Sequence, residues 1–85
     1  MQVLIPTSLR SYTKVSRVEA RGATLAEVLA DLDGRFPGIR FRMVDEQDRM
    51  RPHMRVFVGG RAIHDLSHAL GPADDVCIVQ ALSGG

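Results

Sequence analysis

The segment 24–36 constrains the fold most, because its apolar residues recur at helical spacing and define one face of a helix. Thr24 and Glu27 form a capping box at its start. The Thr24 hydroxyl is placed to accept from the Glu27 N–H, and the Glu27 carboxylate to accept from the Thr24 N–H. A helix with one apolar face must pack against a second layer of structure. The apolar stripe consists of Leu25, Val28, Leu29, Leu32 and Phe36.

The end of this helix is predicted at Pro37-Gly38, where proline and glycine stop helices. Gly34 is an alternative end. Because Phe36 keeps the helical period beyond Gly34, the helix is expected to continue past the glycine.

Five short runs, some apolar throughout and some alternating apolar with polar residues, surround the helix and predict strands. In the first run Val3 and Ile5 share one face and Leu4 lies on the other. Gly59-Gly60 joins two runs and is a two-residue hairpin signal. Strands plus a single amphipathic helix indicate an α+β domain with the helix on one face of a sheet. The predicted strands are 2–6, 14–21, 54–58, 61–64 and 76–81.

The remaining segments are predicted to connect these elements. Segment 7–13 has few apolar residues and is expected to be a loop, and 39–44 a short strand or an irregular edge. Segment 65–70 is expected to form one helical or 3₁₀ turn with Leu66 and Leu70 directed inward. The glycine, proline and aspartates of 71–75 predict a turn before the last strand.

Composition limits the function classes. A chain of 85 residues buries only about 60–65% of its unfolded surface, which leaves little room for an enclosed catalytic pocket. The net charge of +1 is too balanced to favour nucleic acid or an anionic membrane. Cys77 is the single cysteine, so no intrachain disulfide is possible. With neither a charged leader nor about 20 consecutive apolar residues, a cytoplasmic protein is expected.

The last two residues, Gly84 and Gly85, are the most specific functional signal. At ordinary glycine usage such a pair ends a chain by chance in roughly half a per cent of cases, so a functional tail is favoured. Residues 1–81 are predicted to form the domain and 82–85 a flexible tail. The tail reaches at most about 13 Å, and its tip is the carboxylate of Gly85.

Together these features resemble the ubiquitin-like β-grasp family, and within it the prokaryotic sulfur carriers of the MoaD, ThiS and CysO type. The resemblance rests on the opening strand, the helix, the Gly59-Gly60 hairpin, the 71–75 turn and the terminal Gly84-Gly85. The opening sequence from Ile5 to Arg10 is closest to the CysO branch. The resemblance implies a mixed four- to five-stranded sheet in which the first and last strands are parallel neighbours at the centre.

The resemblance also implies a carrier, a protein cosubstrate that can be counted as the small subunit of a sulfur-transferring synthase, and not an enzyme. An adenylating enzyme of the MoeB/ThiF type would use ATP and Mg²⁺ to convert the Gly85 carboxylate to an acyl-adenylate. Sulfur would then displace AMP and leave a thiocarboxylate. A cysteine-synthase-like enzyme or a molybdopterin synthase large subunit would accept that sulfur. The carrier itself is expected to bind no cofactor.

The same resemblance assigns roles to residues around the tail. Ser83 and Gly84 would give the tail its reach. Four residues without an aromatic ring would form the surface that faces the partner enzymes, and an exposed apolar patch of this kind is expected to bind protein. They are Leu4, Pro6, Val79 and Leu82.

Alternatives remain at this point. The chain could be a ubiquitin-like modifier joined through Gly85 to lysines of other proteins, or a binding module with an inert tail. His64 and His68 have metal-ligand spacing, but without a third ligand no metal site is predicted. Six arginines of the middle segments form either a solvated face or a contact with an acidic partner surface. They are Arg40, Arg42, Arg49, Arg51, Arg55 and Arg61.

Overall fold

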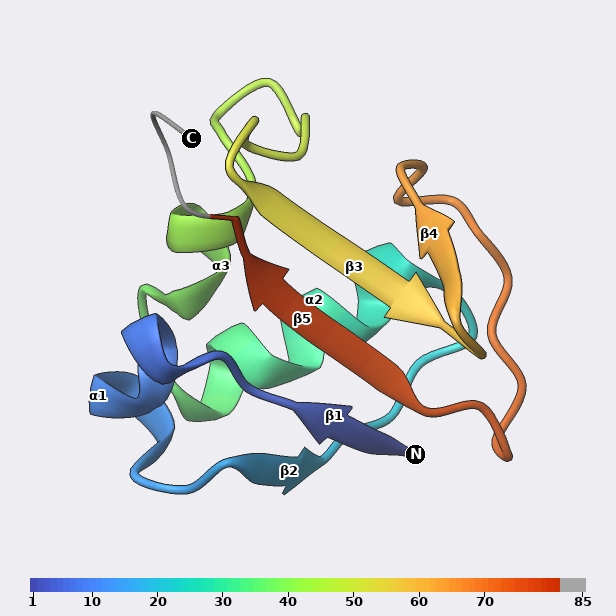
Figure 1. The fold of residues 1–85 in the computed structure, drawn as a ribbon, viewed down its shortest axis with the longest axis horizontal. Helices are drawn as coiled ribbons and strands as arrows, with labels where there is room; N and C mark the ends of the chain where they lie inside the picture. The colour runs from blue at the N-terminus through green and yellow to red at the C-terminus, as the bar shows by residue number, and fades with distance from the viewer. Residues whose placement is uncertain (82–85) are drawn as a thin grey trace.

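A five-stranded mixed sheet is the centre of the computed structural model, which describes residues 1–81 (Figure 1). The strands are β1 (Gln2–Leu4), β2 (Arg17–Glu19), β3 (Met54–Val58), β4 (Arg61–Ile63) and β5 (Val76–Gln80). Their order across the sheet is β2-β1-β5-β3-β4. The central strands β1 and β5 are parallel, and the other neighbours are antiparallel. The α+β architecture and the parallel central pair are therefore as predicted.

The main helix, α2 (Leu25–Arg35), packs behind the sheet (Figure 1). Four residues of its predicted stripe are buried, and Phe36 packs against the same core. The helix continues past Gly34, as predicted, and the Phe36 N–H donates to the Leu32 carbonyl at 2.7 Å. The stripe of α2 and the alternate residues of the strands form one core, because both periodicities place their apolar side chains between the two layers.

The start of α2 differs from the prediction in one half of the capping box. The Thr24 hydroxyl accepts from the Glu27 N–H at 3.2 Å, as predicted. The Glu27 carboxylate accepts instead from the Ala23 N–H at 3.2 Å. The Leu25 and Ala26 amides donate to the carbonyls of His68 and Leu66, so the loop after β4 satisfies amides that a helix start leaves unpaired.

The prediction of a loop over 7–13 is wrong. A 3₁₀ helix, η1 (Thr7–Leu9), runs into a short helix, α1 (Arg10–Thr13). Leu9 is buried and anchors this pair to the core. Lys14 ends α1 in the left-handed conformation, at φ 66°, and donates to the Arg10 carbonyl at 2.8 Å.

The prediction of a strand or irregular edge over 39–44 is also wrong, because these residues form the helix α3 (Ile39–Met43). Ile39 and Met43 are four apart and both fully buried, which is a helical spacing. Gly38 takes φ 94° before the helix, a conformation that glycine adopts readily. The Asp33 carboxylate then accepts from the amides of Gly38 and Arg40 at 3.1 Å each.

Two of the turn predictions hold in their main features. Gly59 and Gly60 both have positive φ, at 58° and 80°, and they close the β3–β4 hairpin. In segment 65–70 the His68 N–H donates to the Asp65 carbonyl at 3.1 Å, which makes a hydrogen-bonded turn without a helix. Leu70 is buried and Leu66 packs against the core, so both point inward as predicted.

Candidate functional site

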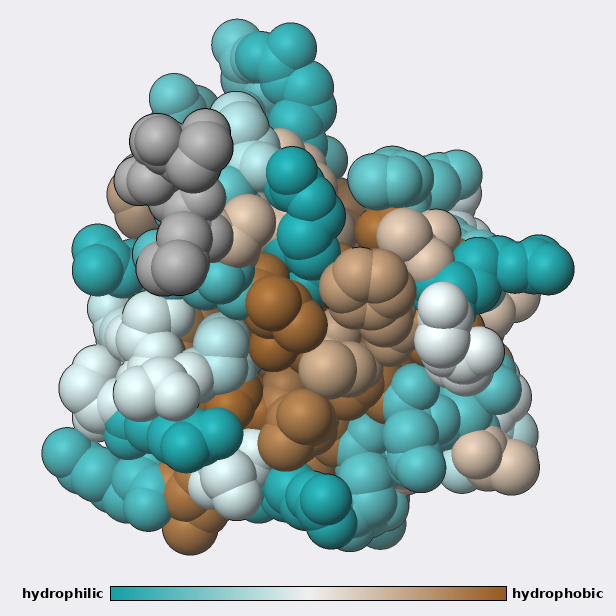
Figure 2. Space-filling view, in the orientation of Figure 1, coloured by the Kyte–Doolittle hydropathy of each residue, from teal (hydrophilic) through white to brown (hydrophobic). Residues whose placement is uncertain are grey.

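The two faces of the sheet are unlike. The helix α2 covers one face, and the opposite face of residues 1–81 is free of helices at its centre (Figure 1). Apolar atoms gather on this open face over β1, β5 and β3 (Figure 2). Val79 is 38% exposed, and the other members are half-buried. We call this surface the open-face patch; it consists of Leu4, Pro6, Phe57, Cys77 and Val79.

Strand register explains why these side chains meet. Cys77 of β5 pairs with Leu4 on one side and with Phe57 on the other. Val79, two residues further along β5, points to the same face. The alternate residues Val76 and Ile78 point into the core and are both 1% exposed. The patch is therefore a consequence of one register across three strands.

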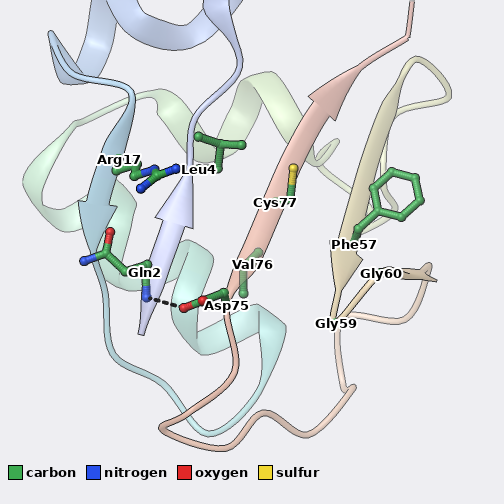
Figure 3. Close-up of a pocket in the computed structure, with 9 residues that line it drawn as sticks. All are labelled: Gln2, Leu4, Arg17, Phe57, Gly59, Gly60, Asp75, Val76 and Cys77. Atoms are coloured by element: carbon green, nitrogen blue, oxygen red, sulfur yellow. Dashed lines mark hydrogen bonds between the residues drawn. The ribbon is translucent and has the colours of Figure 1, made fainter.

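One hollow of the open face has a volume of 540 Å³ (Figure 3). Leu4, Cys77 and Phe57 line it from three neighbouring strands. Gly59 and Gly60 contribute no side chains at the hairpin end, which leaves that end open. The hollow is apolar in the middle and charged at its edge. The remaining lining residues are Gln2, Arg17, Asp75 and Val76, of which the Gln2 N–H donates to the Asp75 carboxylate at 3.4 Å.

A second hollow, of 460 Å³, lies along β5 toward its end. It brings together Leu4, Pro6 and Val79, three of the four residues predicted to face a partner. Arg10 also lines it, and its Nε donates to the Ile5 carbonyl at 3.1 Å. The fourth predicted residue, Leu82, lies outside the described residues.

The predicted tail residues Ser83, Gly84 and Gly85 also lie outside the described residues. The last described residue, Ala81, donates its N–H to the His53 carbonyl at 2.7 Å. Gln80 before it lines the second hollow. The chain therefore leaves the sheet at the end of the open-face patch.

Phe57 and Cys77 were not among the residues predicted to form this surface. Phe57 supplies an aromatic ring, whereas the predicted patch contained none. The alternation in β3 was a usable signal, because Met54, Val56 and Val58 are buried and Phe57 must then face the other way. The pairing of Phe57 with Cys77 required the strand order as well.

The carboxylates with a shifted pKa lie away from the patch. Backbone N–H groups, first that of Arg49, lower the pKa of Asp45, and the backbone N–H and the hydroxyl of Ser67 lower the pKa of Asp65. The N-terminal amino group of Met1, 2.8 Å away, lowers the pKa of Glu19. None of these three carboxylates lines either hollow of the described residues. Asp45 and Asp65 stabilise turns, and Glu19 binds the N-terminal amino group just before the first strand.

Residues 1–81 contain no group of three or more histidine, cysteine, aspartate or glutamate side chains placed to hold a metal ion. In the same part of the chain, every helix is too short or too polar to cross a membrane.

Known proteins are similar to this chain in sequence and in fold. Residues 3–85 match the ThiS family. The sulfur carrier protein CysO of Mycobacterium tuberculosis is 33% identical over 89 residues, which cover 98% of this chain and 96% of that protein. A chain of the Amycolatopsis orientalis BexX/CysO complex superposes with a TM-score of 0.91 at 33% identity, covering 99% of this chain and 98% of that one. SAMP1 of Haloferax volcanii superposes with a TM-score of 0.79 at 25% identity, covering 100% and 98%.

Proposed function

The chain belongs to the ThiS family as a sulfur carrier of the CysO and ThiS type, and on this premise we propose that the carboxylate of Gly85 carries the sulfur. It is a small carrier protein and not an enzyme. The open-face patch docks partner enzymes, and residues 82–85 deliver the carboxylate to their active sites. The observation that carries this proposal is the position of Ala81, fixed to His53 at the end of the patch.

The chemistry requires activation, because a carboxylate is a poor electrophile. A carboxylate oxygen of Gly85 attacks the α-phosphorus of ATP, and pyrophosphate leaves with the electrons of the broken P–O bond. Sulfide then adds at the acyl carbon and expels AMP. A persulfide adds through its terminal sulfur and also expels AMP, and a thiol then cleaves the S–S bond of the resulting acyl disulfide and is itself oxidised to a disulfide. The product is a thiocarboxylate, whose sulfur is an anion at neutral pH and a nucleophile without help from a base on the carrier.

Two partners follow from this chemistry. The first is an adenylating enzyme of the MoeB/ThiF type, which holds ATP and Mg²⁺. The second accepts the sulfur, and a cysteine-synthase-like enzyme is proposed before a molybdopterin synthase large subunit, because relatives at 33% identity are named CysO. The similar CysO of Amycolatopsis orientalis is known in a complex with BexX, so a relative of this chain binds a protein partner.

Intact mass spectrometry tests the proposal. The carrier is incubated with the adenylating enzyme, ATP, Mg²⁺ and a sulfur donor. The expected result is the mass increase that corresponds to one oxygen replaced by sulfur, located by fragmentation at Gly85. An unchanged mass, while the same enzyme thiocarboxylates an established carrier, would contradict it.

The variant Gly85→Ala sharpens this test, because it places a methyl group next to the reacting carboxylate. We expect its rate of thiocarboxylate formation to fall at least about tenfold, or about 1.4 kcal/mol in the barrier. Its thermal unfolding is expected to match that of the unmodified chain. Equal rates for the two proteins would contradict the expectation that the active site of the adenylating enzyme requires glycine at position 85.

A second function, conjugation of Gly85 to lysines of other proteins, is favoured by the similarity to SAMP1, a protein named small archaeal modifier protein. Both functions would use the same acyl-adenylate. Conjugates with an isopeptide bond to Gly85, found in cells by mass spectrometry, would support the modifier.

A further inference from the structure

A third hollow, of 360 Å³, lies beyond the end of the open-face patch and differs from the other two in charge. Three basic side chains line it, those of Arg42, Arg51 and His53, and no carboxylate of residues 1–81 does. Gln80 also lines it, so the hollow adjoins the point where the chain leaves the sheet. The other lining residues are Ser8, Leu9 and Phe41.

The structure divides the basic region that the sequence predicted. Arg40 forms an ion pair with Asp48 at 2.8 Å, and Arg49 lies 3.8 Å from the Asp45 carboxylate. These two charges are compensated within the protein. Within residues 1–81, Arg42 and Arg51 have no carboxylate within 4.0 Å. Arg55 and Arg61 also lack such a carboxylate within residues 1–81, but of these four arginines only Arg42 and Arg51 line the third hollow.

Arg51 is held in place there. Its Nε donates to the Phe41 carbonyl at 2.7 Å, and its guanidinium lies 4.6 Å from the centre of the Phe41 ring. The Phe41 side chain is nevertheless 57% exposed. A guanidinium fixed in this way loses little conformational freedom when it binds an anion. An exposed ring beside it offers apolar contact to the same ligand.

We propose that the third hollow is a docking site for an acidic segment of the adenylating enzyme. This proposal rests on the proposed function and adds a second recognition surface to it. Charge complementarity identifies the occupant: two carboxylates of the partner would pair with Arg42 and Arg51, and an apolar partner residue would cover Phe41. Contact here, next to Gln80 and Ala81, orients the chain immediately before the tail.

A protein segment fits the hollow better than a small anion does. The hollow is open, and its basic side chains are half-buried or exposed, whereas a tight small-anion site needs converging, desolvated donors. A partner that spans the open-face patch and this hollow would contact both an apolar and a basic surface. That arrangement gives an interface an apolar centre and a charged rim.

ATP–pyrophosphate exchange catalysed by the adenylating enzyme tests the proposal, with the carrier as the varied substrate. Arg42→Glu is expected to leave the fold unchanged, because Arg42 is exposed and its side chain makes no hydrogen bond within residues 1–81. We expect Arg42→Glu to raise the KM for the carrier at least about fivefold, and Arg42→Glu with Arg51→Glu about tenfold or more, with kcat within about twofold. Arg61→Glu, exposed on β4, is the matched control and should leave KM unchanged.

Salt gives a second readout. Raising the NaCl concentration should increase the KM for the unmodified carrier, because salt screens its ion pairs with the enzyme. The KM for the doubly substituted carrier should change less, because the substitutions have already removed those pairs. Circular dichroism verifies that each variant is folded.

Three results would overturn the docking proposal. The KM of Arg42→Glu could equal that of the unmodified carrier, or Arg61→Glu could raise KM as much. Titration of the carrier alone with inorganic sulfate could also give saturating shifts of the Arg42 and Arg51 amide signals, while the same sulfate leaves the KM for the carrier unchanged. That result would identify a small-anion site. In each case exchange with the unmodified carrier would still report activation of Gly85, so the proposed function is judged separately.

Discussion

The covered and open faces of the sheet use the same strands for different purposes. On the covered face, Val3, Val56 and Ile78 are at most 1% exposed and pack against α2. On the open face, their sequence neighbours Leu4, Phe57 and Cys77 remain half-buried and line hollows. Strand alternation separates the two sets at every residue. A chain this small can therefore hold its fold with one set and bind partners with the other.

This division predicts that the two faces respond differently to substitution. Changes on the covered face should lower stability, and partner binding should change only with the folded fraction. Changes on the open face should weaken partner binding in protein that stays folded.

The largest effect is expected from truncating the same residue type on each face. Leu29→Ala, fully buried in α2, should lower the free energy of unfolding by about 2–5 kcal/mol. Leu4→Ala, half-buried on the open face, should lower it by about 1 kcal/mol. Urea denaturation measures both values, and equal losses of stability would contradict the proposed difference between the two faces.

The next effect concerns binding. Phe57→Ala should raise the dissociation constant for the adenylating enzyme about tenfold or more, because buried aromatic anchors dominate interfaces. Its stability should fall by only about 1 kcal/mol. Val15→Ala is the matched control, since Val15 is 52% exposed and lines none of the three hollows. Isothermal titration calorimetry gives the constants, and a similar loss in both variants would contradict a specific patch.

Two glycine substitutions in the covered layer should have opposite effects, and the second of them is the smallest effect expected. A Cβ added at Gly22 would lie 2.6 Å from the Val28 nitrogen, a backbone atom of α2. Gly22→Ala should therefore destabilise by about 1–3 kcal/mol. Gly34→Ala should stabilise by about 0.5–1 kcal/mol, because Gly34 lies in α2 with nothing within 4 Å of the added carbon. Thermal unfolding shifts of opposite sign are the expected result; shifts of the same sign would contradict the close contact at Gly22.

Long periodic segments were predictable from the sequence and short ones were not. The helix α2 has enough turns to establish a period, and the Gly59-Gly60 pair specifies its hairpin. The helices η1, α1 and α3 have at most five residues each, too few for a helical period to stand out. The parallel pairing of β1 with β5 joins residues more than seventy positions apart, and only the family resemblance indicated it.

The candidate site was also only partly predictable from the sequence. Leu4, Pro6 and Val79 were assigned through the resemblance and do lie together. Phe57 was missed although its strand alternation was readable. The basic hollow depends on tertiary structure, because α3 and the loop after it bring Phe41 and Arg51 together. A sequence pattern shows six arginines, but only the fold shows which of them a carboxylate already compensates.

Methyl NMR of the carrier with its adenylating enzyme tests the use of the open face most directly. The methyl signals of Leu4 and Val79 should shift or broaden on binding. The methyl signal of Ala30, exposed on α2, should stay unchanged. If Ala30 responds while Leu4 and Val79 do not, the enzyme binds the helix side, and the open face is not the docking surface.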